Sequence, residues 1–179
     1  MRARLVALVA LAMVFAGSVP AHAQHHGHGH GHPSGAPTDG HLRAQACIED
    51  FEAVVRDGRG FGMAFAADQE GYPGPLHVLE LKDRLRLDPA QEARVRALLQ
   101  AMFDEARPKG ARLLDAEARL RRLFATGTAD ASAVRAAVAE VEQARTALRL
   151  VHLLAHLETR ALLTEAQRRA YHEARWPGR

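Results

Sequence analysis

Two long stretches with a repeating apolar pattern constrain the fold of this chain more than any other feature. In residues 89–124, apolar or small side chains keep a seven-residue register at Val95, Met102, Ala116 and Leu123. In residues 130–162 the same register runs through Val134, Val141, Leu148 and Ala155. Such patterns are typical of helices that pack along a coiled-coil-like seam. Because only residues 127–130 separate the two stretches, we expect an antiparallel helical hairpin.

Two matching signals mark helix starts. Asp88, Pro89 and Gln91 place an N-cap carboxylate, a proline at the first helical position and a glutamine at the third. Thr164 and Gln167 repeat the arrangement as a capping box, in which two side chains bond to free backbone N–H groups. We therefore predict structural caps at Asp88, Gln91, Thr164 and Gln167, with a final helix over residues 165–175.

Shorter helices are expected before the hairpin. Residues 39–57 carry an apolar helical stripe that ends at a glycine pair, and at most a short helix fits in residues 61–70. There, Phe61, Met63 and Phe65 are interpreted as covering a core edge. A further short helix should follow Pro75 and turn inward the side chains of Leu76, Leu79 and Leu81 or Leu85.

Two features complicate the hairpin. Pro108 with Gly110 predicts a kink or break near Arg107. Residues 148–157 contain so many leucines that more than one neighbour must cover them. The candidates are the helix after Pro75, the final helix and a second protomer. The fold class is thus all-α, in a single domain over residues 41–176.

The amino-terminal residues 1–23 have the pattern of a secretory signal peptide: Arg2 and Arg4, an apolar run, and a small-residue cleavage site ending at Ala23. Loss of the two arginines lowers the formal net charge from +3 to about +1. Without a dense basic stripe or interleaved aromatic residues, we expect no nucleic-acid partner. No later segment approaches the about 18 consecutive apolar residues of a membrane helix, so we expect a periplasmic protein without a membrane span in the mature chain.

Residues 24–40 are dominated by histidine, glycine and proline, a composition that predicts a disordered tail. Its histidines can converge on a transition metal because the backbone is flexible. The alternative is a solubilising low-complexity segment. The candidate tail ligands are His25, His26, His28, His30 and His32.

The sequence offers no catalytic machinery that we recognise. It lacks a glycine-rich phosphate loop, a Gly-x-Ser-x-Gly elbow and an HExxH zinc motif. Cys47 is the single cysteine, so an intrachain disulfide is excluded, and this thiol is buried, free or part of an interchain bridge. We therefore expect a protein that is not an enzyme.

The sequence resembles a known family at its two cap motifs. Residues 163–167 form an LTxxQ motif, and residues 87–91 look like a diverged first copy, preceded by GYPGP at residues 71–75. With the signal peptide and the helical pattern, residues 58–176 resemble the Spy/CpxP superfamily, which includes heavy-metal-resistance sensors of the CnrX type. The resemblance implies a hooked helical hairpin that dimerises into a curved cradle.

The resemblance also implies two functions. Spy-like members are ATP-independent chaperones for unfolded envelope proteins, whereas CnrX-like members bind metal ions and signal to a membrane partner. We expect a non-enzymatic periplasmic chaperone or stress protein with accessory heavy-metal binding. The alternative is a heavy-metal sensor or resistance protein with a membrane-anchored signalling partner. Both versions are expected to be homodimers.

His152 and His156 carry the most specific chemical prediction. Their i, i+4 spacing places both imidazoles on one side of a helix, where they can share a metal ion. The family architecture would bring His77 and Glu80 alongside, and this donor set suits nickel, cobalt, copper or zinc. In the CnrX-type pattern a second histidine and a methionine stand where this chain has Leu81 and His156. The alternative is that the histidines are half-buried and bond to Glu80, Glu158 or backbone, and no cofactor is required.

Overall fold

The structure is a computed structural model that describes residues 39–178, and this part of the chain consists of helices without any strand. The all-α prediction is therefore confirmed. The predicted signal peptide and the five tail histidines lie outside the described residues. The helices are α1 (Asp39–Arg56), α2 (Phe65–Gln69), α3 (Pro75–Glu80), α4 (Lys82–Leu85), α5 (Pro89–Ala125), α6 (Ala131–Leu162) and α7 (Glu165–Arg175).

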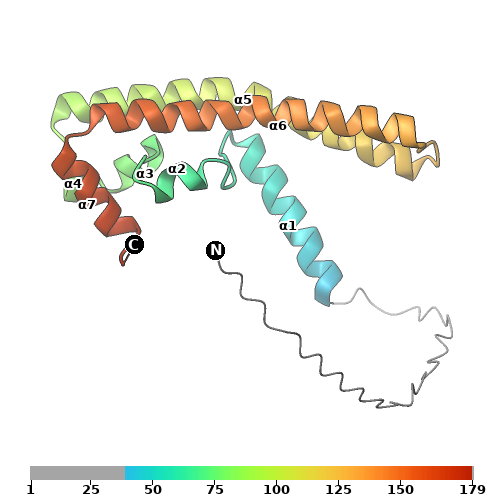
Figure 1. Cartoon of the computed structure of the whole chain (residues 1–179), viewed down its shortest axis with the longest axis horizontal. Helices are drawn as coiled ribbons and strands as arrows, with labels where there is room; N and C mark the ends of the chain where they lie inside the picture. The colour runs from blue at the N-terminus through green and yellow to red at the C-terminus, as the bar shows by residue number, and fades with distance from the viewer. Residues whose placement is uncertain (1–38, 179) are drawn as a thin grey trace, which may run out of the picture. The chain divides into compact units, whose positions relative to one another are not determined.

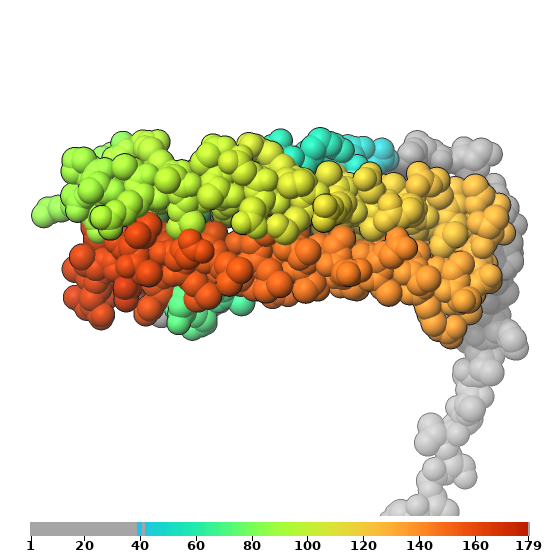
Figure 2. All heavy atoms as spheres, turned by 90° about the horizontal axis from the view of Figure 1, so that it is seen from above, coloured from blue at the N-terminus to red at the C-terminus, as the bar shows by residue number. Residues whose placement is uncertain are grey.

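Helices α5 and α6 form the predicted antiparallel hairpin and lie side by side along their length (Figures 1 and 2). Asp130 begins α6 by accepting hydrogen bonds from the backbone N–H groups of Ser132 (2.7 Å) and Ala133 (2.8 Å). The seam between the helices is the main core. Burying each large apolar side chain there stabilises the fold by about 1.5–3 kcal/mol. Its buried members include Met102, Ala106, Leu113, Ala116, Val141, Leu148, Val151 and Ala155.

Of the kink or break expected near Arg107, the break is wrong, because α5 is continuous through Pro108, and the kink stays a prediction. Pro108 is exposed, so the Asp104 carbonyl that loses its helical donor can face water, and the seam supports the helix on both sides. Gly110 has a different role: a Cβ atom at this position would lie 2.6 Å from the Val55 carbonyl oxygen. This glycine therefore lets the end of α1 pack directly onto α5.

Both capping boxes are present, and the structure joins them. Asp88 accepts from Gln91 N (2.8 Å), and Thr164 accepts from Gln167 N (3.3 Å). The two glutamine side chains also bond to each other at 2.9–3.0 Å. Gln91 Nε2 lies 3.0 Å from the carbonyl oxygen of Leu162 at the end of α6. The two motifs thus tie the start of α5 to the junction of α6 and α7.

A second core lies at this end of the hairpin, where α3, α4 and α7 meet α5. Its buried side chains are Val78, Leu85, Val95, Leu163 and Tyr171. The prediction for the segment after Pro75 needs correction. It forms two short helices instead of one. Leu85 is buried as predicted, whereas the other buried residue is Val78; Leu79 and Leu81 are half-buried against the same core, and Leu76 is half-buried.

Neither the helix after Pro75 nor α7 covers the leucine-rich part of α6. Leu150, Leu154 and Leu157 are 50%, 52% and 53% exposed, so these two candidates for their cover are wrong. Cys47 is an exposed free thiol on α1, which excludes the buried alternative. Within residues 39–178, every helix falls short of the length and apolar content that a membrane crossing requires.

Candidate metal-binding site

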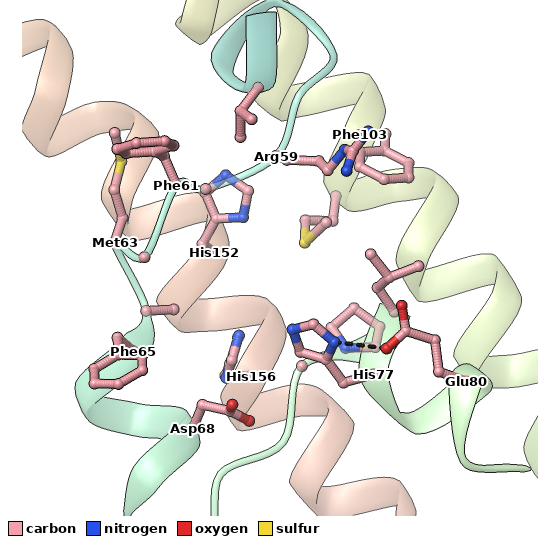
Figure 3. A pocket seen from close by; sticks show the side chains of 18 of the residues that line it. Arg59, Phe61, Met63, Phe65, Asp68, His77, Glu80, Phe103, His152 and His156 are labelled. Carbon is pink, nitrogen blue, oxygen red and sulfur yellow. Dashed lines mark hydrogen bonds and ion pairs between the residues drawn. The ribbon is translucent and has the colours of Figure 1, made fainter. Parts of the chain in front are cut away.

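A pocket of about 400 Å³ lies between α6 and the segment that carries α2 and α3 (Figure 3). The structure brings all four predicted folded-domain residues, His77, Glu80, His152 and His156, to its wall. Its apolar wall includes Phe61, Met63, Phe65, Met102 and Phe103. Of the three residues predicted to cover a core edge, Met63 packs against the main core. Phe61 and Phe65 are about half exposed, at 49% and 51%, and border this pocket instead.

His152 and His156 project from one side of α6 and are buried, with exposed fractions of 4% and 8%. The loops that cover them carry glycine where they approach most closely. A Cβ atom at Gly74 would lie 2.7 Å from Nε2 of His156, and one at Gly60 would lie 3.0 Å from the His152 ring. Any larger residue at Gly74 would displace the imidazole. The glycines at these two positions therefore allow the loops to pack closely over the histidines.

The hydrogen bonds of His156 determine which nitrogen is available. Its Nδ1 lies 2.6 Å from the carbonyl oxygen of Tyr72 and must donate, because a carbonyl only accepts. In the neutral ring, Nε2 then carries the lone pair that a metal ion uses. For His152 Nε2, no hydrogen-bond partner is found among the described residues, although the atom is buried. An unpaired buried polar atom is costly, so a ligand on His152 Nε2 would offset that cost.

The environment favours the neutral form of both rings. Burial, with a smaller contribution from repulsion by a charged His156, lowers the pKa of His152 to about 4. Burial also lowers the pKa of His156, and the hydrogen bond to Tyr72 opposes this effect in part. Metal ions bind the neutral imidazole, so near neutral pH neither ring has to lose a proton first.

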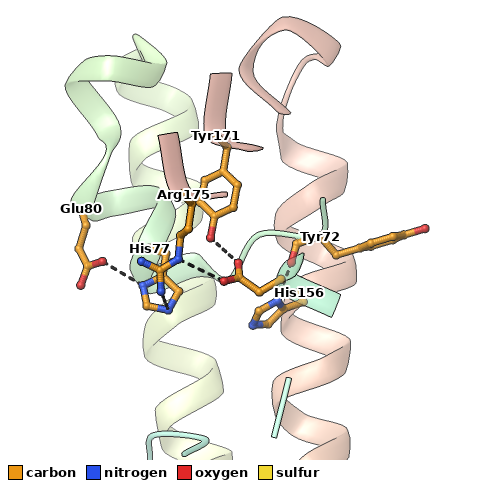
Figure 4. Close-up of polar contacts among 7 residues, drawn as sticks. Tyr72, His77, Glu80, His156, Tyr171 and Arg175 are labelled. Atoms are coloured by element: carbon orange, nitrogen blue, oxygen red, sulfur yellow. Dashed lines mark hydrogen bonds and ion pairs between the residues drawn. The ribbon is translucent and has the colours of Figure 1, made fainter. Parts of the chain in front are cut away.

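His77 and Glu80 form a hydrogen-bonded pair on α3. Nδ1 of His77 lies 2.9 Å from Oε2 of Glu80, and Nε2 lies 3.0 Å from Nη2 of Arg175 (Figure 4). Arginine only donates, so Nε2 accepts and Nδ1 donates to the carboxylate. The alternative interpretation, in which the histidines bond to Glu80, Glu158 or backbone, thus holds for His77, which bonds to Glu80, and for His156, which bonds to backbone. Among the described residues, Glu158 is not a partner of these histidines.

Three functional candidates were missed by the sequence analysis. Asp68 on α2 is 4% exposed and accepts hydrogen bonds from the hydroxyl of Tyr171 and from Nε of Arg175, the latter at 3.1 Å. Burial and the Asp68 carboxylate raise the pKa of Tyr171. The i, i+4 spacing of Tyr171 and Arg175 was the only signal in the sequence that they share a face. Their partner lies over one hundred residues away, where no local pattern points to it.

The donor chemistry fits a borderline transition metal, because neutral imidazoles and carboxylates together suit nickel, cobalt, copper and zinc. The unpaired nitrogen of His152 supports the fit. In residues 39–178, however, no three His, Cys, Asp or Glu side chains lie close enough to share one ion. The four predicted residues line one pocket without converging on a single point.

The fold and the pocket define a helical-hairpin protein with imidazole groups enclosed beside the hairpin. The heavy-metal resistance family matches residues 60–170, which is more than half of the chain, and the protein belongs to this family. The matched range contains Asp68 and the four predicted residues but ends before Tyr171 and Arg175. Comparison with curated proteins and with solved structures gave no significant match.

Proposed function

We propose that this chain is a non-enzymatic periplasmic heavy-metal-binding protein, in which the pocket beside α6 takes up a transition-metal ion and a membrane-anchored partner responds. The observation that carries the proposal is the pair of buried imidazoles on α6, one of which has an unpaired nitrogen. His77 and Glu80 on the same pocket wall supply further donors. Membership of the heavy-metal resistance family supports the proposed metal binding, and the signal-peptide pattern supports the proposed periplasmic location.

The residues present indicate how an ion would be held. His152 and His156 offer neutral Nε2 atoms, and the hydrogen bond from His156 to Tyr72 orients its ring in the way that outer-shell contacts orient metal ligands. Glu80 orients His77 in the same manner. Bound metal would supply a charge that these donors share and that draws them together.

The test is a calorimetric titration of the mature chain with nickel, cobalt, copper and zinc. The five tail histidines are replaced by asparagine, so that any binding belongs to the folded domain. We expect one saturable site per chain for at least one of these ions, because the pocket groups imidazoles and carboxylates at one place. Binding that disappears with the tail histidines would contradict the proposal and assign metal uptake to the tail.

The exposed leucines of α6 favour a second function, an ATP-independent chaperone for unfolded envelope proteins. Leu150, Leu154 and Leu157 follow i, i+4, i+7 spacing, lie on one face of the helix and are each half exposed. A contiguous exposed apolar surface is typical of an interaction site. A second copy of the chain, in the predicted homodimer, is the competing occupant of this face.

Light scattering of an unfolding client with stoichiometric mature protein tests the chaperone function. We expect the parent chain to suppress aggregation and the L150S/L154S/L157S variant to lose most of this effect, because the apolar contact surface is gone. The variant L42S/I48S on α1, which removes other exposed apolar residues, serves as the matched control. Equal suppression by the parent and by the α6 variant would exclude this face as the client site.

A further inference from the structure

Arg175 already places a positive charge between two groups that can bind metal. Its Nη2 donates to Nε2 of His77 (3.0 Å) and its Nε donates to Oδ2 of Asp68 (3.1 Å). Figure 4 shows the guanidinium reaching His77 from α7, next to Tyr171. An arginine side chain keeps its charge at any ordinary pH. The side chain is still 35% exposed, so it can leave this position without crossing the core.

Asp68 requires a cation at this place. Its carboxylate is almost fully buried, and a buried carboxylate is strongly unfavourable unless it is paired. The hydroxyl of Tyr171 satisfies Oδ1, whereas Arg175 supplies the only positive charge that the structure pairs with Asp68 in the described residues. A metal ion would satisfy the same carboxylate. Either cation, Arg175 or a metal ion, therefore keeps Asp68 paired. If both are absent, the negative charge of Asp68 is uncompensated.

Figure 3 shows Asp68 at the pocket wall next to His156 and His77. Nε2 of His77, which accepts from Arg175, is the same atom that a metal ion would use. Arg175 therefore occupies donor atoms of both side chains at once. It bridges the His77 ring and the Asp68 carboxylate, and no three donors converge on one point in the described residues.

Building on the proposed metal-binding function, we propose that Asp68 is a carboxylate ligand of the site and that Arg175 is the resident cation that an incoming metal ion displaces. Oδ2 of Asp68, Nε2 of His77 and Nε2 of His156 would then hold the ion in place of the guanidinium. Two cations cannot hold the same donors, so Arg175 lowers the affinity for metal. By linkage, metal weakens the contacts of Arg175 by the same factor.

The exchange reaches the carboxyl-terminal end of α7. Trp176 follows Arg175 and packs edge-on against Phe65 of the pocket wall, with 5.3 Å between the ring centroids. When metal displaces Arg175, this end of α7 loses its ionic contact and Trp176 changes its surroundings. Trp176 is the only tryptophan of the chain, so its fluorescence reports the displacement directly. The end of α7 is then the element that a partner can read.

The test uses the mature chain with asparagine at the five tail histidines, titrated with Ni²⁺ and Zn²⁺ and followed by calorimetry and Trp176 fluorescence. We expect Arg175→Gln to tighten binding at least about tenfold and Asp68→Asn to weaken it by a similar factor, within the usual range of coupling between sites. Arg175→Lys should fall between parent and Arg175→Gln, because a single ammonium cannot bridge both groups. The matched control is Arg169→Gln, which removes the same charge from α7 at an exposed position.

The outcomes separate the two proposals. Metal should change the fluorescence of the parent but not of Arg175→Gln, where the end of α7 is already released. If the parent binds metal and neither Arg175→Gln nor Arg175→Lys binds more tightly, the exchange is wrong while the metal-binding function stands. If no variant binds metal, both proposals fail.

The controls test for effects of charge and folding. A gain in affinity for Arg169→Gln as large as for Arg175→Gln would show that the gain comes from the overall charge of the chain and not from the position of Arg175. Circular dichroism establishes that each variant is folded, and Arg175→Lys is the fallback if Arg175→Gln is not.

Discussion

Replacing His152 and His156 together with alanine should abolish metal binding by the folded domain. The two residues supply the buried imidazoles of the pocket, and both are expected to be neutral near pH 7. Substitution of groups that merely orient metal ligands already costs about 10–100-fold in affinity, so we expect a loss of at least about 100-fold here. Calorimetric titration of the chain with silenced tail histidines measures it.

The controls separate lost ligands from lost structure. His172→Ala removes a histidine that does not line the pocket and should leave the affinity unchanged. A second double variant, His152→Gln with His156→Gln, keeps most of the side-chain volume and should show the same loss. If either folded double variant binds as tightly as the parent, the site on α6 is wrong.

Acidification in the absence of metal should destabilise this fold, with His152 as a principal cause. Burial lowers the pKa of His152 in the folded chain to about 4, below its ordinary value of 6.5. The unfolded chain therefore binds the proton more readily. The stability tied to the neutral ring is fully present above pH 6.5 and is lost as the pH falls toward 4. Linkage gives a loss of about 2 kcal/mol between pH 7 and pH 5 from this residue alone.

Urea unfolding at pH 7 and pH 5 measures this effect. His152→Gln should reduce the difference between the two unfolding free energies by about 2 kcal/mol, because glutamine does not titrate. His156 is shifted in the same direction, so the variant should keep part of the dependence. His172→Gln controls for removal of a histidine outside the pocket. An identical pH dependence in His152→Gln and the parent would show that the His152 ring does not carry it.

The candidate site was predictable in part. The i, i+4 spacing of His152 and His156 indicated a shared helix face, and the structure places both on one wall of the pocket. The resemblance implied that His77 and Glu80 lie nearby, and they line the same pocket. Asp68, Tyr171 and Arg175 were missed because their contacts join α2 to α7 across more than one hundred residues. The leucine-rich face of α6 predicted neighbouring helices that bury it, but the described helices leave its leucines half exposed.

The sequence by itself determined the elements whose causes are local. Apolar periodicity defined α5 and α6, and a side chain that bonds to backbone three residues away defined the starts of α5 and α7. Tertiary structure alone decided that Gln91 bonds to Gln167, that α5 continues through Pro108, and that Arg175 joins His77 to Asp68. The physical reason is the distance along the sequence over which each interaction acts. Capping and periodicity act within a few turns of one helix, whereas a buried charge finds its partner only after the whole chain has packed.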